Sequence, residues 1–535
     1  MSHFVAVVGE GVGFGLITGW NCGELLVQRT DGAWWQACGK GQWEVMIGCM
    51  VRTRMWLVMA FLGILPLVVG CNARSPGSFG SSAVQIHQVS ESREVSAEAL
   101  TERLESVMTD WFGTPDKPRW PTAEKLTNCG IDQASLLVSL VDPKQLERAA
   151  GPVRRLEDRV EYGLYRKHCA HCHGVSGDGW GATAANLSPY PRDFRRGTFK
   201  FKSTPVGSRP TRSDLMAVLK RGIPGTSMPS FASLSESKHF RDDYEPLIDY
   251  VIYLSVRGEV ERRLIGALSE SGEEGWEAAL PTDQKSTAPD ALPSVAREVA
   301  EVLRRWRHAS QEVLEVPDNE LADRSIEDLW SSPQRAQLLA AIERGEKLFG
   351  MPATACTSCH GLSGRGDGRV VDYDEWTKDW TIRAGVDPTD RSQWKRWSRL
   401  GVGKPVPDRP RDLHAGVYRG GASPQDLYRR IAGGIDGSPM PALPLKPTNP
   451  QGWTPQDVWD LVHFVRWLPY SEQFPRESAA QSATSGATAE QASGDRQSVA
   501  LSLDLPAGPE TIDDGRSIAG IESGSDRPAL DKEIP

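Results

Sequence analysis

The sequence predicts a mainly α-helical protein in which two similar helical domains are joined by a helical spacer and flanked by disordered termini. A segment near residue 170 and another near residue 360 contain the same short motifs in the same order, which indicates an internal repeat. Each copy ends in a stretch with apolar residues at helical spacing, and a third such stretch lies between the copies. The chain after Tyr470 is rich in Ser, Ala, Gly and Gln without periodicity, which is typical of disorder.

Each copy of the repeat begins with a Cys-x-x-Cys-His motif, from Cys169 to His173 and from Cys356 to His360. This spacing is the attachment signature of c-type haem. The two thiols add to the vinyl groups of the porphyrin, and the adjacent His supplies the proximal iron ligand. An alternative is that the two motifs pair as a single Cys₄ zinc site. Haem is favoured because each motif has a Met of its own downstream, which a zinc site does not need.

A Met followed by Pro occupies the same place in both copies. Met228 lies thirteen residues after Leu215, and Met440 lies thirteen residues after Leu427. A Met at this place can close the sixth coordination position of haem iron, as in electron-transfer cytochromes. The predicted iron ligands are therefore His173 with Met228 and His360 with Met440.

Other histidines are weaker ligand candidates. His414 follows the second Pro-Arg-Asp motif and rivals Met440 as the distal ligand of the second haem. His168 and His171 flank or lie within the first motif and are expected to point away from the iron. His463 lies on the last predicted helix, where a polar surface position is the simplest interpretation.

The repeat resembles the class I cytochrome c family over residues 155–258 and 337–470. A Pro-Arg-Asp motif follows each haem motif, at Pro191 and Pro410, and each copy closes with an amphipathic stretch. The resemblance implies an N-terminal helix that leads into the haem motif and crosses a C-terminal helix. It also implies a Pro-containing loop after the proximal His and a Gly-rich loop that carries the distal Met.

The same resemblance implies two covalently bound haem c groups and assigns their ligands. The residues carried over are Cys169, Cys172, His173 and Met228 for the first haem, and Cys356, Cys359, His360 and Met440 for the second. Loop prolines also match those whose loop carbonyl orients the proximal His. The candidates are Pro189 or Pro191 in the first copy and Pro407 or Pro410 in the second, and the sequence does not choose between them.

The stretch that begins near Met50 predicts the cellular location of the protein. Arg52 and Arg54 precede an apolar run over 55–69, which is shorter than the roughly 20 residues of a membrane-spanning helix. A basic head, an apolar middle and small residues before a cut describe a secretory signal. Its end, Val-Val-Gly followed by Cys71, resembles a bacterial lipoprotein box in which the Cys is acylated. An uncleaved anchor or an ordinary signal is the alternative. The expected location is the periplasmic side of a bacterial membrane, anchored by lipid.

The predicted domain plan has eight parts. These are a mis-assigned upstream extension (1–49), a lipoprotein signal peptide (50–70), a flexible tether (71–99), a helical lead-in (100–150), the first cytochrome c domain (151–260), a spacer with a helix over 295–313 (261–335), the second cytochrome c domain (336–470) and a disordered tail (471–535).

Two further features have competing interpretations. The second domain carries an insertion with four tryptophans, Trp376, Trp380, Trp394 and Trp397, which suit a docking surface or, more simply, a satellite core. Cys129, in the lead-in, is expected to be a small buried hydrophobe.

The predicted function is electron transfer rather than catalysis. The net charge of −9 gives no reason to expect a nucleic-acid partner. A haem with His and Met ligands has no open coordination position, so the expected role is to carry single electrons between proteins of a respiratory chain. Two alternatives stay open: a cytochrome subunit of a quinol-oxidising or dehydrogenase complex, and an enzyme of the di-haem peroxidase kind.

Overall fold

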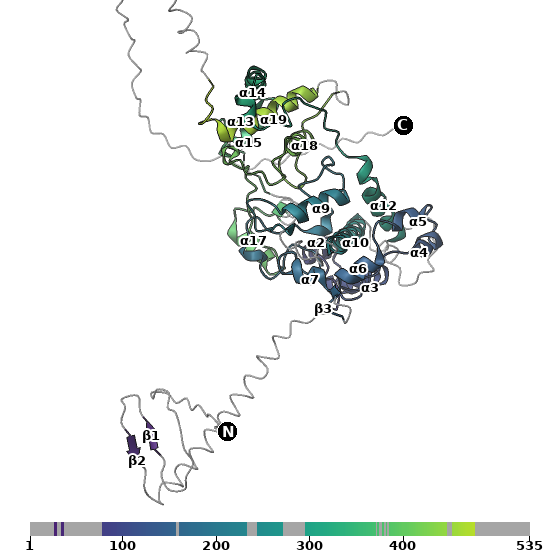
Figure 1. The fold of residues 1–535 in the computed structure, drawn as a ribbon. Helices are drawn as coiled ribbons and strands as arrows, with labels where there is room; N and C mark the ends of the chain where they lie inside the picture. Colours follow the sequence, from purple (N-terminus) through teal and green to yellow (C-terminus); the bar gives the residue numbers. More distant parts are fainter. Residues whose placement is uncertain are drawn as a thin grey trace, which may run out of the picture. The chain divides into compact units, whose positions relative to one another are not determined.

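A computed structural model describes most of the chain between residues 77 and 476. The described residues are 26–28, 34–36, 77–156, 160–232, 243–270, 295–370, parts of 372–381, 385–446 and 452–476. The predicted signal peptide, Cys71 and nearly all of the predicted tail lie outside these residues. The described part is mainly helical, which confirms the predicted fold class (Figure 1). Its strands are short: β1 (Leu26–Gln28) pairs antiparallel with β2 (Trp34–Gln36), and β3 (Arg154–Arg155) pairs antiparallel with β4 (Glu161–Tyr162).

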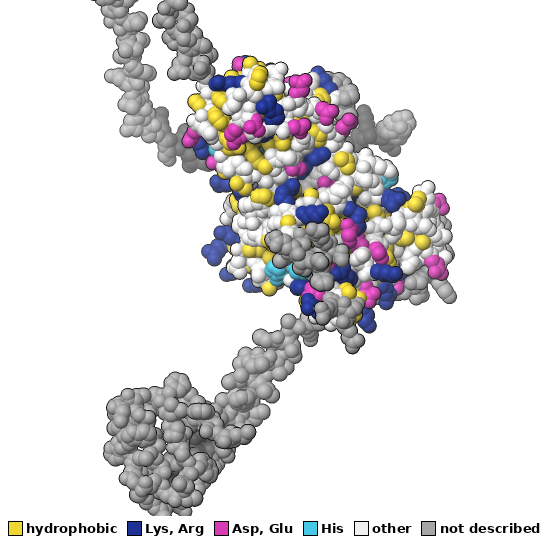
Figure 2. Space-filling model, in the orientation of Figure 1, with side chains coloured by type: hydrophobic (Ala, Val, Ile, Leu, Met, Phe, Trp, Pro, Cys, Tyr) yellow, Lys and Arg dark blue, Asp and Glu magenta, His cyan; other side chains and the backbone are white. Residues whose placement is uncertain are grey.

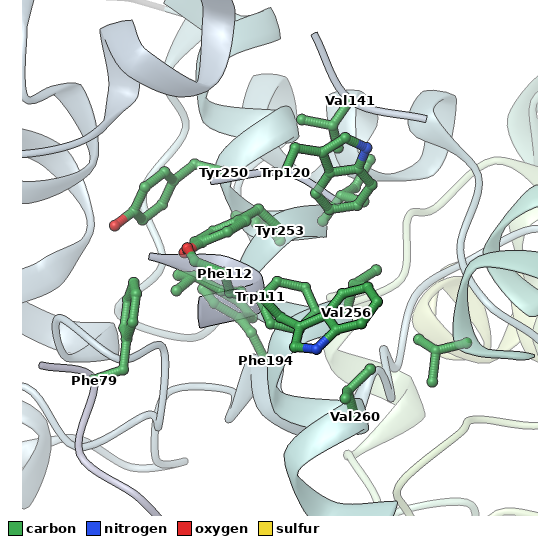
Figure 3. Packing of buried hydrophobic residues seen from close by; sticks show 14 of the residues in the cluster. Phe79, Trp111, Phe112, Trp120, Val141, Phe194, Tyr250, Tyr253, Val256 and Val260 are labelled. Carbon is green, nitrogen blue, oxygen red and sulfur yellow. The ribbon is translucent and has the colours of Figure 1, made fainter. Parts of the chain in front are cut away.

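The core of the first domain forms around one long helix, α10 (Tyr244–Glu270). Tyr253, on this helix, contacts four aromatic rings at centroid distances between 5.5 and 6.5 Å (Figure 3). These partners are Phe79, Phe112, Trp120 and Tyr250. Because three of them precede residue 121 in the chain, the lead-in is part of the core of the first domain.

The helices that pack on α10 come from both sides of it in the sequence. They are α2 (Ala83–Arg93), α3 (Ala97–Phe112), α6 (Pro143–Ala149), α7 (Leu164–His168), α9 (Arg212–Arg221) and α12 (Val295–His308). Two shorter helices, α4 (Ala123–Asn128) and α5 (Ala134–Val138), complete the lead-in. Cys129 is exposed rather than buried, because it is the cap residue at the end of α4, where the chain leaves the helix.

Part of the predicted flexible tether (71–99) is a helix packed on the first domain. Residues 83–93 form α2, and Ile86 and Val89 on this helix are buried together with Phe79. The backbone amide of Ser82 donates a hydrogen bond to Glu261 on α10, 3.0 Å away. A few apolar side chains at helical spacing suffice to dock a segment that is polar on average, and composition alone does not reveal them.

The first domain also does not end at residue 260. Leu264 and Leu268, in the last turns of α10, are as buried as the residues before them, and they pack on α12. The facing side of α12 supplies Val299, Leu303 and Trp306. The spacer helix therefore belongs to the core of the first domain, and it ends at His308 rather than at residue 313.

In the second domain two helices cross at very close range. They are α14 (Arg335–Gly350), which leads into the haem motif, and α19 (Pro455–Trp467). A Cβ atom on Gly345 would lie 2.1 Å from the backbone oxygen of Asp460, whereas one on Gly350 would meet nothing. The crossing therefore requires Gly at position 345. The first domain has only the five-residue α7 in the place of α14, and the lead-in helices α3 and α6 cover α10 there.

The remaining elements of the second domain are short. They are α13 (Ile326–Trp330), α15 (Cys356–His360), α17 (Arg391–Ser398), α18 (Pro424–Gly433), and 3₁₀ turns η7 (Leu413–Ala415) and η8 (Leu468–Tyr470). The first domain has α8 (Ala170–His173), η1 (Ala184–Asn186) and η2 (Phe194–Arg196) beside its own motifs, and η5 (Ala309–Gln311) follows the spacer helix.

His463 is fully buried, which contradicts the surface position expected from the sequence. Its Nε2 lies 3.0 Å from Oδ1 of Asn319, and its ring stacks on Trp459. Burial lowers the pKa of His463 to about 3, and the positive charges of Arg466 and Arg344 add to this effect. Helix α19 is covered on the side that the sequence pattern suggested was open, so His463 is a neutral core residue.

Part of the Trp-rich insertion forms a small core of its own. Trp397, on α17, is buried with Val386 and Val402, and Val84 of α2 packs against them. Arg396 also forms an ion pair with Glu91 of α2. Trp397 is therefore a packing residue, as the satellite-core interpretation predicts. Trp394 is half-buried beside it, and Trp376 and Trp380 lie outside the described residues.

Candidate haem sites

The first haem motif folds into a single helical turn. Cys169 precedes α8, and the backbone amides of Cys172 and His173 both donate to the carbonyl of Cys169, at 3.1 and 2.9 Å. Because one turn separates the two cysteines, both thiols can face the same side of the helix. Both are free thiols in the structure.

A cavity of about 270 Å³ lies beside this turn. The residues that line it include Cys169, Cys172, His173 and Met228. Most of the remaining wall is apolar, with Leu187, Phe199, Leu215, Leu219 and Val251 among the lining residues. Two thiols, an imidazole and a thioether around one apolar cavity are the groups that a c-type haem requires, so the residues fit this cofactor.

Two contacts hold the ring of His173, the predicted proximal ligand, in one orientation. Its Nδ1 lies 3.0 Å from the carbonyl oxygen of Arg192, and its ring stacks on Phe194 with centroids 4.5 Å apart. A carbonyl can only accept, so Nδ1 carries the proton and Nε2 is left as the free donor atom. Burial lowers the pKa of His173 to about 4, which keeps the imidazole neutral. The orienting carbonyl thus belongs to Arg192, the residue after Pro191, rather than to a proline.

The distal loop of the first site begins where α9 ends. Gly222 ends this helix with a φ of 67°, and the amide of Ile223 then donates to the carbonyl of Met228 at 3.1 Å. The hydroxyl of Thr226 donates to the Ile223 carbonyl at 2.8 Å and accepts from the Met228 amide at 3.2 Å. These local hydrogen bonds shape the loop, and Met228 packs half-buried against the first core.

The second site repeats this local geometry. The amide of Gly366 donates to the carbonyl of His360 at 2.9 Å, as Gly179 does to His173 at the same distance. In the distal loop the amide of Ile435 donates to the carbonyl of Met440 at 3.1 Å. Ser438 is equivalent to Thr226. Its hydroxyl donates to the Ile435 carbonyl at 2.7 Å and accepts from the Met440 amide at 3.3 Å. The repeat seen in the sequence is therefore also a repeat of backbone structure.

The two sites differ at the proximal His. Nδ1 of His360 is buried and has no hydrogen-bond partner among the described residues, whereas Nδ1 of His173 is bonded to Arg192. Burial lowers the pKa of His360 as well. A hydrogen bond at this nitrogen raises the basicity of a ligating imidazole, so the two irons would have unequal proximal ligands.

The rival histidines have other roles. His414 places Nε2 2.8 Å from the carbonyl of Ser363 and Nδ1 3.5 Å from the hydroxyl of Ser471, so both nitrogens already have partners within the protein. His168 and His171 line the first cavity, although the sequence suggested that both point away from the iron, and the ring of His168 lies edge-on to Phe231.

The described part of the chain offers no alternative metal centre or membrane span. Among the described residues, no three His, Cys, Asp or Glu side chains are grouped to hold a metal ion, so no assembled site supports the Cys₄ zinc alternative. Within the same residues, no helix is both long and apolar enough to cross a membrane.

Comparison with known proteins identifies the two domains. Residues 159–251 match the family model of cbb3-type cytochrome c oxidase subunit III, and residues 342–469 match the cytochrome c family model. Both matched segments are therefore c-type cytochrome domains, as the resemblance predicted. No curated protein matches it significantly. A solved structure, a reducing HAO-like protein complex of Kuenenia stuttgartiensis, has a chain that is 24% identical. That match covers 57% of this chain and 94% of the other, with a TM-score of 0.33, too low to bear on fold or function.

Proposed function

We propose that this c-type cytochrome is a di-haem electron carrier that passes single electrons between redox proteins of a respiratory chain. The observation that carries the proposal is the presence of two His/Met sets, each on the same hydrogen-bonded loops, in one chain. When bound, a haem with these ligands supplies a one-electron couple with no open coordination position. Two such sites suit transfer rather than chemistry on a substrate.

The protein residues tune and protect that couple. His173 offers a neutral, oriented Nε2, and Met228 offers a soft sulfur that favours ferrous iron. Apolar side chains such as Leu215, Leu219 and Val251 line the first cavity and exclude water. Because an apolar wall disfavours the extra charge of ferric iron, these residues act in the same direction as the Met ligand.

A second candidate function is that of a cytochrome subunit in a larger complex, and one surface feature favours it. Around the second haem motif, Leu362 is 89% exposed, and Met351 and Val370 are 40% and 49% exposed. Exposed apolar side chains beside a redox site are typical of a docking surface. The match of the first domain to a family of oxidase subunits points in the same direction. The face drawn in Figure 2 carries side chains of both signs of charge.

The carrier proposal can be tested on the purified chain. A redox titration followed by visible spectra should show two one-electron waves, and peroxide should barely change the spectrum because both irons have six ligands. Turnover of peroxide at an enzyme-like rate would contradict the carrier proposal and favour a peroxidase. Retention of the native protein in a large complex through detergent purification would favour the subunit.

Attachment of the protein to a membrane by lipid is a separate proposal that rests on Cys71. We expect Cys71 to be acylated after cleavage of the signal that begins near Met50. The change Cys71→Ala should remove the lipid and either release the protein from the membrane or block its processing. Mass spectrometry of the mature N-terminus and fractionation of membranes measure both effects. The exposed Cys129 provides the matched control, since Cys129→Ala should change neither. A mature chain that starts at residue 1 would contradict the assignment.

A further inference from the structure

Two residues at equivalent positions of the repeat each reach from their own haem domain to the other. Lys200 lies nine residues after Pro191, and Arg419 lies nine residues after Pro410. Lys200 extends from the first domain and donates to Oδ2 of Asp408 in the second domain, 2.6 Å away. Arg419 extends the other way and lines the cavity of the first haem site. The second domain therefore contributes a residue to the first site.

The backbone beside Arg419 is fixed by contacts between the domains. Nη2 of Arg221, at the end of α9, donates to the carbonyl of Gly420 at 3.0 Å. In the reverse direction, Nη1 of Arg430 on α18 donates to the carbonyl of Lys200 at 3.2 Å. These two reciprocal hydrogen bonds hold the segment around Arg419 against the first domain. The position of Arg419 at the cavity is thus supported on both sides.

Arg419 has a charge that the protein does not neutralise fully. Its Nε is buried and has no hydrogen-bond partner among the described residues. Burial and the neighbouring Arg411 lower the pKa of Arg419, and Asp408 opposes them only in part. Asp408 is already bonded to Lys200. Arg419 is half-buried, and a partly desolvated guanidinium is stabilised by an anion beside it, so this site favours one more negative group.

The lining of the first cavity has one sign of charge. Arg192, Lys200 and Arg419 are the Lys and Arg residues among the lining residues, which include no Asp or Glu. The rest of the wall is largely apolar. The occupant that complements such a wall has a large apolar body and carboxylate groups, and the two propionates give haem this character. Arg pairs especially well with carboxylates, because its planar fork of donors matches their geometry.

We propose that Arg419 of the second domain binds a propionate of the haem in the first site. The inference rests on the proposed function, because it needs a haem in that site. A fixed cation near the iron disfavours the extra positive charge of the ferric form, so Arg419 raises the potential of the first haem. It also makes the first site incomplete without the second domain, which ties the two haem domains into one unit.

The test compares the full chain with Arg419→Gln and Arg419→Lys. The Gln variant should keep both haems but shift the redox wave of the first haem to lower potential, while the wave of the second haem moves less. The Lys variant should retain most of the wild-type potential, because it keeps the charge. The Met228→Ala variant identifies which wave belongs to the first haem. Arg409→Gln removes an exposed cation from the same domain and should leave both waves in place.

The outcomes separate this inference from the function on which it rests. Two haems in the Arg419→Gln variant, with waves no different from those of Arg409→Gln, would overturn the inference alone. A wild-type chain with haem only in the second site would overturn both. Equal losses of potential in the Lys and Gln variants would show that charge is not the cause and would also overturn it. If the Gln variant folds poorly by circular dichroism, Arg419→Met repeats the test with the aliphatic stem preserved.

Discussion

Removing both thiols of one haem motif should cost the chain half of its covalent haem and leave the other half attached. In the Cys169→Ala, Cys172→Ala variant the first site loses both thioether bonds, and in the Cys356→Ala, Cys359→Ala variant the second site does. We expect roughly one haem per chain in each, because we propose each motif as the attachment site of one haem. Haem per polypeptide, measured as the pyridine haemochrome after extraction with acidified organic solvent, gives the count.

The structure explains why each loss should stay local. The turn of each motif is held by hydrogen bonds within its own domain, such as that from Gly179 to His173 and that from Gly366 to His360. Cys129→Ala is the matched control, since this thiol is exposed and belongs to neither motif. Removal of all haem from the wild type by acidified solvent would refute covalent attachment. Loss of both haems from one double variant would refute the independence of the sites.

Replacing either predicted distal Met should remove roughly half of the near-infrared band that arises from sulfur ligation of ferric iron, because we propose one His/Met pair in each site. Met228→Ala and Met440→Ala should each also lower the potential of one haem, since loss of the soft sulfur disfavours ferrous iron. Axial ligands move haem potentials over a range of about 0.8 V, so this shift should exceed that of any charge variant. Both variants should also gain a spectral response to peroxide.

The same experiment decides the ligand of the second haem. The hydrogen bond of His414 to the Ser363 carbonyl argues that His414→Ala should leave the band unchanged. Met351→Leu is a suitable control, because this half-exposed Met lies outside both distal loops. An intact band in Met440→Ala, together with a changed spectrum in His414→Ala, would show that the second haem has two His ligands.

Features that depend on a short stretch of chain were open to prediction. The two Cys-x-x-Cys-His motifs and the Met loops each specify their geometry through neighbours within a few residues, as the bonds among Ile223, Thr226 and Met228 illustrate. Local hydrogen bonds of this kind recur wherever the same residues recur, so the repeat in sequence became a repeat in structure. The helical fold class followed from apolar spacing for the same reason.

Features that depend on tertiary packing could not be predicted from the sequence. Polar composition over 71–99 suggested a tether, but α2 packs on α10 because Ile86 and Val89 find a partner surface there. His463 appeared to face water, yet Asn319 and Trp459 enclose it.

By itself, then, the sequence determined the helical class and predicted the haem attachment points and the candidate axial ligands, because each depends on spacing along the chain. Only the tertiary structure decided that the carbonyl of Arg192 orients His173, that His360 lacks the same bond, and that Arg419 reaches across to the other domain. The physical reason is that burial and hydrogen-bond partners are properties of residues brought together from distant parts of the chain. Lys200 and Asp408, which form an ion pair although they are 208 positions apart in the sequence, are an example.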